Sequence, residues 1–192
     1  GNIVSDTITL TFSESSSVSI LRGDINSDGV DEYATEFCAS SDYTFTDDQI
    51  IDSQASTYTW TTSGNGTFSA ADEKAPTYTP GSFDKSSGTV TLTLTVSDAA
   101  GCTTDSDSIT LSVVSEPVLD LSTSATIVCY GSQVQLTAVA DNYTSINWQI
   151  TGGTGLIISG GNTLTPIYQP AIDSSTVELE ATITVDNPCS ST

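Results

Sequence analysis

The sequence has no histidine and no methionine, and it is almost without positive charge. Histidine is the side chain most often used as a general base near neutral pH, so its absence removes both Ser/His and Cys/His nucleophile pairs. The carboxylates are scattered over predicted loops and form no paired constellation. The composition therefore predicts that the chain is not an enzyme.

Only 3 residues are Lys or Arg, against 24 Asp or Glu, which gives a net charge of −21. Such a surface repels nucleic acid and anionic membranes, so we expect neither as a partner. No apolar run approaches the roughly 18 residues of a membrane span, and no signal peptide is visible. We therefore expect no membrane insertion by this segment. Mutual repulsion is relieved by salt or bound cations, which suits a cell-surface or extracellular setting.

What the sequence does contain is typical of β structure. Residues 89–96 read TVTLTLTV, with apolar residues and threonines alternating, and residues 57–62, 108–113 and 133–140 follow the same period of two. This period marks half-buried strands. Turn residues separate the strands, and no segment has helical apolar spacing with caps. The chain is predicted to be all-β, built from immunoglobulin-like sandwich domains.

The chain also repeats itself. Cys38, Trp60, Tyr78 and Cys102 recur as Cys129, Trp148, Tyr168 and Cys189, at offsets of 91, 88, 90 and 87 residues. A period in this range indicates an array of similar domains. The opening residues, V-S-D-T-I-T-L from Val4, match D-S-D-S-I-T-L from Asp105, which follows Cys102. We therefore expect residues 1–12 to be the last strand of a preceding repeat. Residues 13–115 are then a complete repeat, and residues 116–192 a second repeat lacking its final strand.

Trp60 and Trp148 occupy the same position in the two repeats, about 20 residues after a cysteine. A tryptophan there is expected to fill the core of an immunoglobulin-like sandwich. Alternatively, exposed tryptophans stack on sugars, which would indicate a carbohydrate-binding module.

Several longer motifs point to one family. They are C-x-G-S-x-V-x-L-x-A from Cys129, W-T-T-S-G-N-G-T-F-S from Trp60, P-T-Y-T-P-G from Pro76 and S-G-T-V-T-L-T-L-T-V-S-D-A-A-G-C from Ser87. Together they resemble the PKD-like and Ig-like tandem repeats of giant Bacteroidetes cell-surface adhesins, of the SprB gliding-motility type. This resemblance implies secretion by the type IX system, a cell-surface location and a role in adhesion.

The same phylum carries an Asp-Ser/Thr-apolar O-glycosylation sequence, which Asp6-Thr7-Ile8 and Asp107-Ser108-Ile109 resemble. The two copies occupy the same place in successive repeats. Strand patterning explains them equally well, because Thr and Ile are favoured in strands.

A calcium site is predicted between residues 24 and 32. Asp24, Asn26, Asp28 and Glu32 place side-chain oxygens at loop positions 1, 3, 5 and 9, with the Val30 carbonyl at position 7. Ca²⁺ takes six to eight oxygen ligands, and alternate residues of a tight loop supply them. Residues 17–21 and 33–37, on either side, are expected to be strands. The alternative is a solvated acidic turn.

The four cysteines predict disulfides in a secreted protein. The simplest pairs lie within a repeat, Cys38–Cys102 and Cys129–Cys189. However, Cys38 is expected in a turn before one strand and Cys102 in a turn after another strand of the same direction. Opposite ends of such strands are about 20–25 Å apart, whereas a disulfide needs Cα atoms within about 7 Å. We therefore expect Cys38 to bond Cys189, between repeats. Cys102 and Cys129 would then pair with neighbouring repeats outside the sequence, and free thiols remain a third possibility.

These observations favour a structural and adhesive repeat region of a secreted adhesin, serving gliding motility or surface attachment as a stiff stalk. Expected partners are neighbouring repeats, an external surface or polysaccharide, and outer-membrane motility machinery. The alternatives are a carbohydrate-binding module, which requires exposed Trp or Tyr in a groove, and an accessory domain of a secreted hydrolase.

Overall fold

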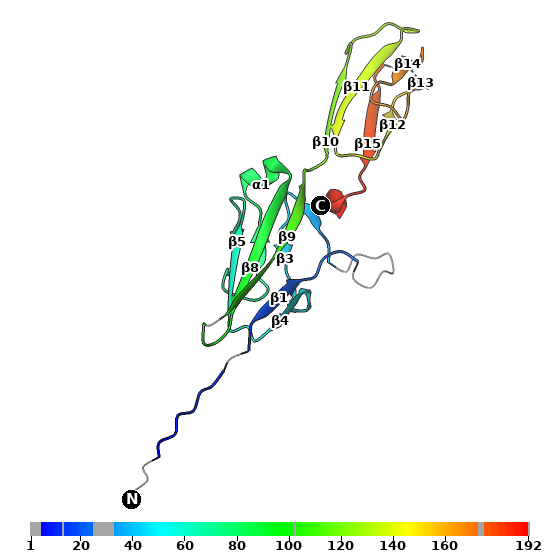
Figure 1. Ribbon diagram of the computed structural model, residues 1–192. Helices are drawn as coiled ribbons and strands as arrows, with labels where there is room; N and C mark the ends of the chain where they lie inside the picture. The colour runs from blue at the N-terminus through cyan, green and yellow to red at the C-terminus, as the bar shows by residue number, and fades with distance from the viewer. Residues whose placement is uncertain (1–4, 13, 25–32, 102, 173–174, 192) are drawn as a thin grey trace, which may run out of the picture. The chain divides into compact units, whose positions relative to one another are not determined.

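The computed structural model describes residues 5–12, 14–24, 33–101, 103–172 and 175–191 (Figure 1). The chain forms two compact units, Gly1–Phe37 with Ser41–Val113, and Cys38–Ser40 with Val114–Thr192. Both are built almost entirely from antiparallel strands, so the chain is an all-β protein of immunoglobulin-like sandwiches, as predicted.

The first unit contains three sheets. A four-stranded sheet has the order β2-β9-β8-β5, a three-stranded sheet the order β3-β7-β6, and β1 pairs with β4. The strands are β1 (Ser17–Ile20), β2 (Glu36–Cys38), β3 (Tyr43–Thr44), β4 (Ile50–Ser53), β5 (Thr57–Thr62), β6 (Thr67–Phe68), β7 (Thr77–Thr79), β8 (Thr89–Ser97) and β9 (Thr104–Val114). A 3-10 turn, η1 (Asp47–Gln49), and a short helix, α1 (Ser82–Ser87), complete it.

The alternating pattern of β8 builds the core of this unit. Val90, Leu92, Leu94 and Val96 are all at most 2% exposed, and the threonines between them face outward. Ile109 and Leu111 of β9 pair with Leu92 and Val90 and are equally buried. A chain of neighbouring rings fills the rest of the core: Phe37, Tyr43, Phe45, Trp60, Phe68 and Tyr78.

Strand β9 also holds β1 through side chains. The backbone N–H of Val18 donates to Asp105 at 2.9 Å, and that of Ile20 donates to Asp107 at 2.8 Å. Arg22 pairs with the same Asp107 carboxylate at 2.7 Å. The aspartates thus satisfy donors on the edge of β1 that would otherwise lack a protein partner.

The second unit has a four-stranded sheet of order β10-β11-β14-β13 and a two-stranded sheet of β12 and β15. Its elements are β10 (Val118–Thr123), β11 (Val134–Asp141), β12 (Ser145–Gly152), β13 (Gly155–Ser159), β14 (Ile167–Pro170), β15 (Glu178–Thr184) and the 3-10 turn η2 (Pro188–Ser191). Its core consists of Val134, Leu136, Ala138, Ile146, Trp148, Tyr168 and Ala181.

The strand registers of the two units coincide. Trp60 faces Leu94 across β5 and β8, and Trp148 faces Ala181 across β12 and β15. Tyr43 pairs with Tyr78, as Val134 pairs with Tyr168. Phe68 faces Tyr78, as Ile157 faces Tyr168. The matching residues are 87 to 91 positions apart, which is the range that the sequence repeat gives.

Three details differ from the sequence expectations. The prediction that the chain contains no helix was wrong at α1, because its six residues are too few to show a helical apolar period. Cys38 is the last residue of β2 rather than part of a turn, and both Phe37 and Cys38 are buried. The described residues 5–12 form no strand. Their assignment to a preceding repeat stays a prediction.

The two compact units divide the chain between residues 113 and 114, and the repeat boundary after residue 115 stays a prediction.

Candidate functional site

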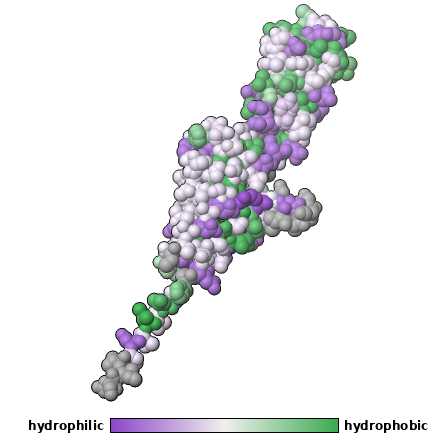
Figure 2. Space-filling model, in the orientation of Figure 1, coloured by the Kyte–Doolittle hydropathy of each residue, from purple (hydrophilic) through white to green (hydrophobic). Residues whose placement is uncertain are grey.

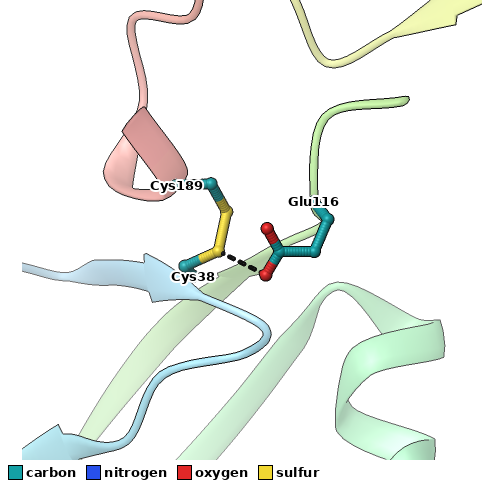
Figure 3. Close-up of side chains that lie close together, drawn as sticks. All are labelled: Cys38, Glu116 and Cys189. Atoms are coloured by element: carbon teal, nitrogen blue, oxygen red, sulfur yellow. Dashed lines mark hydrogen bonds between the residues drawn. A yellow bond between two sulfur atoms is a disulfide. The ribbon is translucent and has the colours of Figure 1, made fainter. Parts of the chain in front are cut away.

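The first candidate site is the disulfide between Cys38 and Cys189, whose Cα atoms are 4.9 Å apart (Figure 3). Cys38 comes from the end of β2, and Cys189 from η2. Both side chains are at most 3% exposed. Cys38–Ser40 belongs to the second unit, although the residues before and after it belong to the first. By this division both cysteines lie in the second unit, and the bond links two segments of it that are 151 residues apart in the sequence.

Short hydrogen bonds position both cysteines. The N–H of Ala39, next to Cys38, donates to the Val114 carbonyl at 2.8 Å. The N–H of Cys189 donates to the Asn187 side chain at 2.8 Å. Asn142, which adopts a positive φ of 52°, donates from its side chain to the Glu116 carbonyl at 3.2 Å. These bonds place the two sulfurs beside the segment that follows β9.

Figure 3 shows the Glu116 carboxylate directed at the disulfide, with Oε1 3.0 Å from Cys38 Sγ. A disulfide sulfur carries no proton to donate. Two free cysteines and a carboxylate at this spacing would be a plausible ligand set for a metal ion. Sulfurs bonded to each other are not thiolate ligands, so in this state the cluster is a covalent staple and not a metal centre.

Strand direction explains why Cys38 does not pair within its own repeat. Cys38 lies at the Val114 end of β9, and Ala39 is hydrogen bonded there. The hairpin between β8 and β9, closed by a bond from Asp98 N–H to the Thr103 carbonyl, is at the other end of β9. The pair found in the structure, Cys38–Cys189, is the one that the strand directions favoured.

The other two cysteines have no described partner. Cys102 lies outside the described residues. Cys129 is exposed and is a free thiol in this chain. Their pairing with neighbouring repeats stays a prediction.

The two tryptophans belong to the core. Trp60 is 3% exposed and Trp148 is 6% exposed. Each indole N–H donates to a backbone carbonyl at the same point of the repeat, Glu73 at 3.1 Å and Thr163 at 3.0 Å. Buried, hydrogen-bonded indoles are not platforms for sugar rings.

A buried acid supports the loops of the first unit. Asp84 is 0% exposed and accepts hydrogen bonds from the N–H of Gly81 at 2.8 Å, the N–H of Asn65 at 3.1 Å and the Tyr78 hydroxyl at 2.7 Å. Burial alone would raise the pKa of Asp84, but these donors outweigh it and hold the pKa below its ordinary value. Burial and the bond to Asp84 raise the pKa of Tyr78 to about 12.

The same network explains two glycines that follow Trp60 in the first unit. A Cβ on Gly64 would collide with the Asp84 carboxylate, and one on Gly66 would collide with the Tyr78 hydroxyl. In the second unit, Gly155 stands against the Tyr168 hydroxyl in the same way. The glycines of W-T-T-S-G-N-G therefore let the backbone approach the Asp84 carboxylate and the hydroxyl of Tyr78, which belongs to P-T-Y-T-P-G.

Most of the predicted calcium ligands, Asn26, Asp28, Val30 and Glu32, lie outside the described residues. Asp24 lies within them. Gly23 and Tyr33, on either side of the loop, form an antiparallel bridge with N–H to carbonyl distances of 2.7 and 3.4 Å. The ends of the loop are thus brought together as in a hairpin, and the calcium site stays a prediction.

The sequence Asp107-Ser108-Ile109 has a structural explanation inside β9. Asp107 accepts hydrogen bonds from β1, and Ile109 is 1% exposed. The Ser108 hydroxyl lies 2.8 Å from that of Thr93 on β8. Strand pairing accounts for all three residues, so the structure favours strand patterning here over a modification signal.

No family model matches the chain, and no curated protein matches it. Among solved structures it is similar to one entitled "D00-D0 domain of Intimin", at 16% sequence identity and a TM-score of 0.41. The likeness covers 89% of this chain and 100% of the other. At this identity and TM-score it says nothing of function. Within the described residues, no helix is long and apolar enough to cross a membrane.

Proposed function

We propose that this chain is a structural repeat segment of a large secreted cell-surface adhesin, and that it has no catalytic role. The observation that supports this most is the covalent bond between residues 38 and 189 in a chain of two units with coincident registers. Repetition of one core with the same pairing builds length, which a stalk needs. The bond adds resistance to extension.

The disulfide changes the path that tension takes. Cys38 and Cys189 are 151 residues apart in the sequence. A pull on the two ends of the oxidised chain passes from Cys38 directly to Cys189, so the residues between them carry no load. The bond also reduces the conformational entropy of the unfolded chain. The chain-entropy model gives a stabilisation of the folded state of about 5 kcal/mol for a loop of this length.

The location follows from the same bond and from charge. Disulfides persist in oxidising compartments outside the cytosol. A net charge of −21 keeps neighbouring molecules apart and attracts cations. The motif resemblance adds the finer part of the proposal, which is secretion by the type IX system and service in gliding motility or surface attachment. Its partners would be neighbouring repeats, an external surface or polysaccharide, and the outer-membrane motility machinery.

Single-molecule force spectroscopy tests the load-bearing role. Handles at the two ends of the chain would be pulled before and after reduction. At about 3.6 Å per residue, the shielded segment hides about 540 Å of contour length, which reduction or Cys38→Ser should release. Cys129→Ser is the matched control and should leave the oxidised length unchanged. Equal lengths with and without reductant would contradict the proposal.

A second candidate, a carbohydrate-binding module, is favoured by one observation. An open pocket of about 340 Å³ in the second unit is lined by Tyr130, which is 61% exposed, and by Tyr168, Thr126, Ile127, Val128, Pro170, Ser175, Thr176 and Val177. Exposed tyrosine faces stack on sugars. Co-sedimentation with insoluble polysaccharides tests this role. Retention of the chain that Tyr130→Ala abolishes would support this role. If no polysaccharide retains the chain, the carbohydrate-binding role is rejected and the structural role is the one that stands.

A further inference from the structure

The surroundings of the Cys38–Cys189 disulfide contain acceptors for two thiol protons. Glu116 Oε1 lies 3.0 Å from Cys38 Sγ (Figure 3). The carbonyl oxygens of Val114 and Ser115 lie 3.5 and 3.6 Å from Cys189 Sγ. A disulfide has no proton to give to these oxygens, whereas the two thiols of the reduced form can donate to them. The oxygens around the sulfurs therefore suit the reduced cysteines as well as the oxidised pair.

Contacts other than the sulfur–sulfur bond position both cysteines. The N–H of Ala39, next to Cys38, donates to the Val114 carbonyl at 2.8 Å. The N–H of Cys189 donates to the Asn187 side chain at 2.8 Å. All of these residues belong to the second unit. Reduction of the disulfide removes none of these hydrogen bonds, so we expect the two thiols to stay close together.

The cluster has the composition and nearly the spacing of a metal site. Cys38, Cys189 and Glu116 offer two sulfurs and a carboxylate oxygen that all lie within 4.8 Å of one another. Ligands of a tetrahedral zinc site are about 3.5–3.8 Å apart, because Zn–S bonds are about 2.3 Å long and Zn–O bonds about 2.0–2.2 Å. The contact of 3.0 Å between Glu116 and Cys38 is close to this spacing. The two sulfurs have only to separate, which breaking their bond allows.

We propose that reduction converts this disulfide into a binding site for a thiophilic divalent cation such as Zn²⁺, held by the thiolates of Cys38 and Cys189 and the carboxylate of Glu116. Three protein ligands leave a fourth position to water. The same two segments are then joined in both states, by the sulfur–sulfur bond or by the metal. Because disulfide formation takes seconds to hours, a new chain passes through the reduced state. This proposal does not rest on the proposed function.

The conversion balances with a dithiol as the reductant. Its thiolate attacks one sulfur of the disulfide, the S–S bond breaks and a mixed disulfide forms. The second thiol of the reductant then displaces the cysteine, so that the protein gains two electrons and two protons and the dithiol becomes a cyclic disulfide. The cation displaces the two thiol protons into solvent and binds the resulting thiolates.

The sulfur ligands separate this site from the acidic surface of the chain. Figure 2 shows hydrophilic residues on the surfaces of both units, and a net charge of −21 attracts cations of every kind. Thiolates select Zn²⁺, and Co²⁺ as its spectroscopic substitute, whereas Ca²⁺ and Mg²⁺ take oxygen ligands. Calcium should therefore not displace the metal from the reduced site.

Cobalt titration of the full chain tests the proposal, in a Cys102→Ser, Cys129→Ser background that leaves only Cys38 and Cys189 as thiols. The chain is reduced with a dithiol, which is then removed by gel filtration without air. The reduced chain should bind one Co²⁺, with a thiolate-to-metal charge-transfer band and the intense visible bands of a four-coordinate site. Zn²⁺ should remove these bands, and excess Ca²⁺ should not. No such bands in the reduced chain, or the same bands in the oxidised chain, would overturn the proposal.

Substitution of Glu116 distinguishes a folded site from two accidental thiols. In the same background, Glu116→Gln replaces an anionic ligand by a neutral amide and should weaken Co²⁺ binding at least about tenfold. Asp120→Asn removes the same charge from an exposed position on β10 and should bind Co²⁺ like the background chain. If the reduced chain unfolds and Glu116 moves away from the thiols, all three proteins bind Co²⁺ equally. Equal affinities would therefore refute the site, whether or not the reduced chain is folded.

Discussion

The two units pair the same residues across the same strands but fill their cores differently. In the first unit Phe45 and Phe68 lie beside Trp60, and Tyr43 lies beside Phe45. The second unit has Leu136, Ile157 and Val134 at the matching positions. In the described residues, β8 pairs with β5 and β9, and β15 pairs with β12. The strand register that the two units share thus follows from the strands and from the shared Trp and Tyr. Elsewhere in the core, aliphatic residues can replace aromatic ones without changing this register.

The largest effect should come from the tryptophans, which the two units share. Trp60→Ala and Trp148→Ala are each expected to cost about 3–5 kcal/mol in the unit that carries the change. Each variant keeps one tryptophan, whose fluorescence reports urea unfolding of the unaltered unit. Hydrogen exchange follows the altered unit, and Trp→Phe is the milder control. A loss of unfolding free energy below about 0.5 kcal/mol in either unit would be typical of a surface tryptophan. It would contradict the claim that the two units share a core tryptophan.

The next effect should be confined to the first unit. Asp84→Asn leaves the buried donors around it poorly satisfied and should cost about 2 kcal/mol at neutral pH. Because the folded pKa of Asp84 is below the ordinary 3.8, its stabilisation is present above that value. It is lost as pH falls through the lower folded pKa.

The difference between wild type and Asp84→Asn should therefore shrink in acid. Urea unfolding at several pH values measures it, in a Trp148→Phe background so that only Trp60 fluoresces. A pH-independent difference would assign the effect to packing instead of charge.

Calcium should sharpen the contrast further, because the second unit has no sequence equivalent of the loop at residues 24–32. Binding at ten times the dissociation constant would stabilise the first unit by about 1.4 kcal/mol. Calorimetric titration measures the binding. Asp28→Ala should abolish it, and the exposed Asp72→Ala should not. The site does not exist if millimolar calcium gives no heat or if Asp28→Ala binds unchanged.

The smallest effect concerns Glu116 and the disulfide. Its carboxylate oxygen lies 3.0 Å from Cys38 Sγ and repels an incoming thiolate. Glu116→Gln should accelerate reduction by glutathione about fivefold, the equivalent of about 1 kcal/mol of repulsion in water. Asp120→Asn, an exposed change on β10, is the charge-matched control. Equal rates for Glu116→Gln and wild type would show that the carboxylate does not protect the bond.

Much of the fold could be predicted because it depends on short-range patterns. The alternation in residues 89–96 became β8, and the two tryptophans are buried where an immunoglobulin-like sandwich needs them. Strand direction, inferred from the repeat, led to the pair Cys38–Cys189. Each of these inferences used only period, spacing or the reach of a strand.

The remainder depends on contacts between residues far apart in the sequence. Helix α1 has no apolar period, and it is held by Asp84, which reaches Asn65 and Tyr78. Glu116 belongs to no sequence motif, and only the folded structure shows that its carboxylate lies next to Cys38. Glycines 64 and 66 were visible as turn residues, but the reason for them is the tyrosine hydroxyl and carboxylate that they admit.

Disulfide mapping by mass spectrometry under non-reducing conditions tests the central claim most directly. With only 3 Lys and Arg residues, pepsin digestion in acid is the better choice, and acid also suppresses thiol exchange. The account predicts a Cys38 peptide linked to a Cys189 peptide, lost on reduction. Recovery of Cys38 linked to Cys102 would contradict this pairing and the strand directions from which it follows.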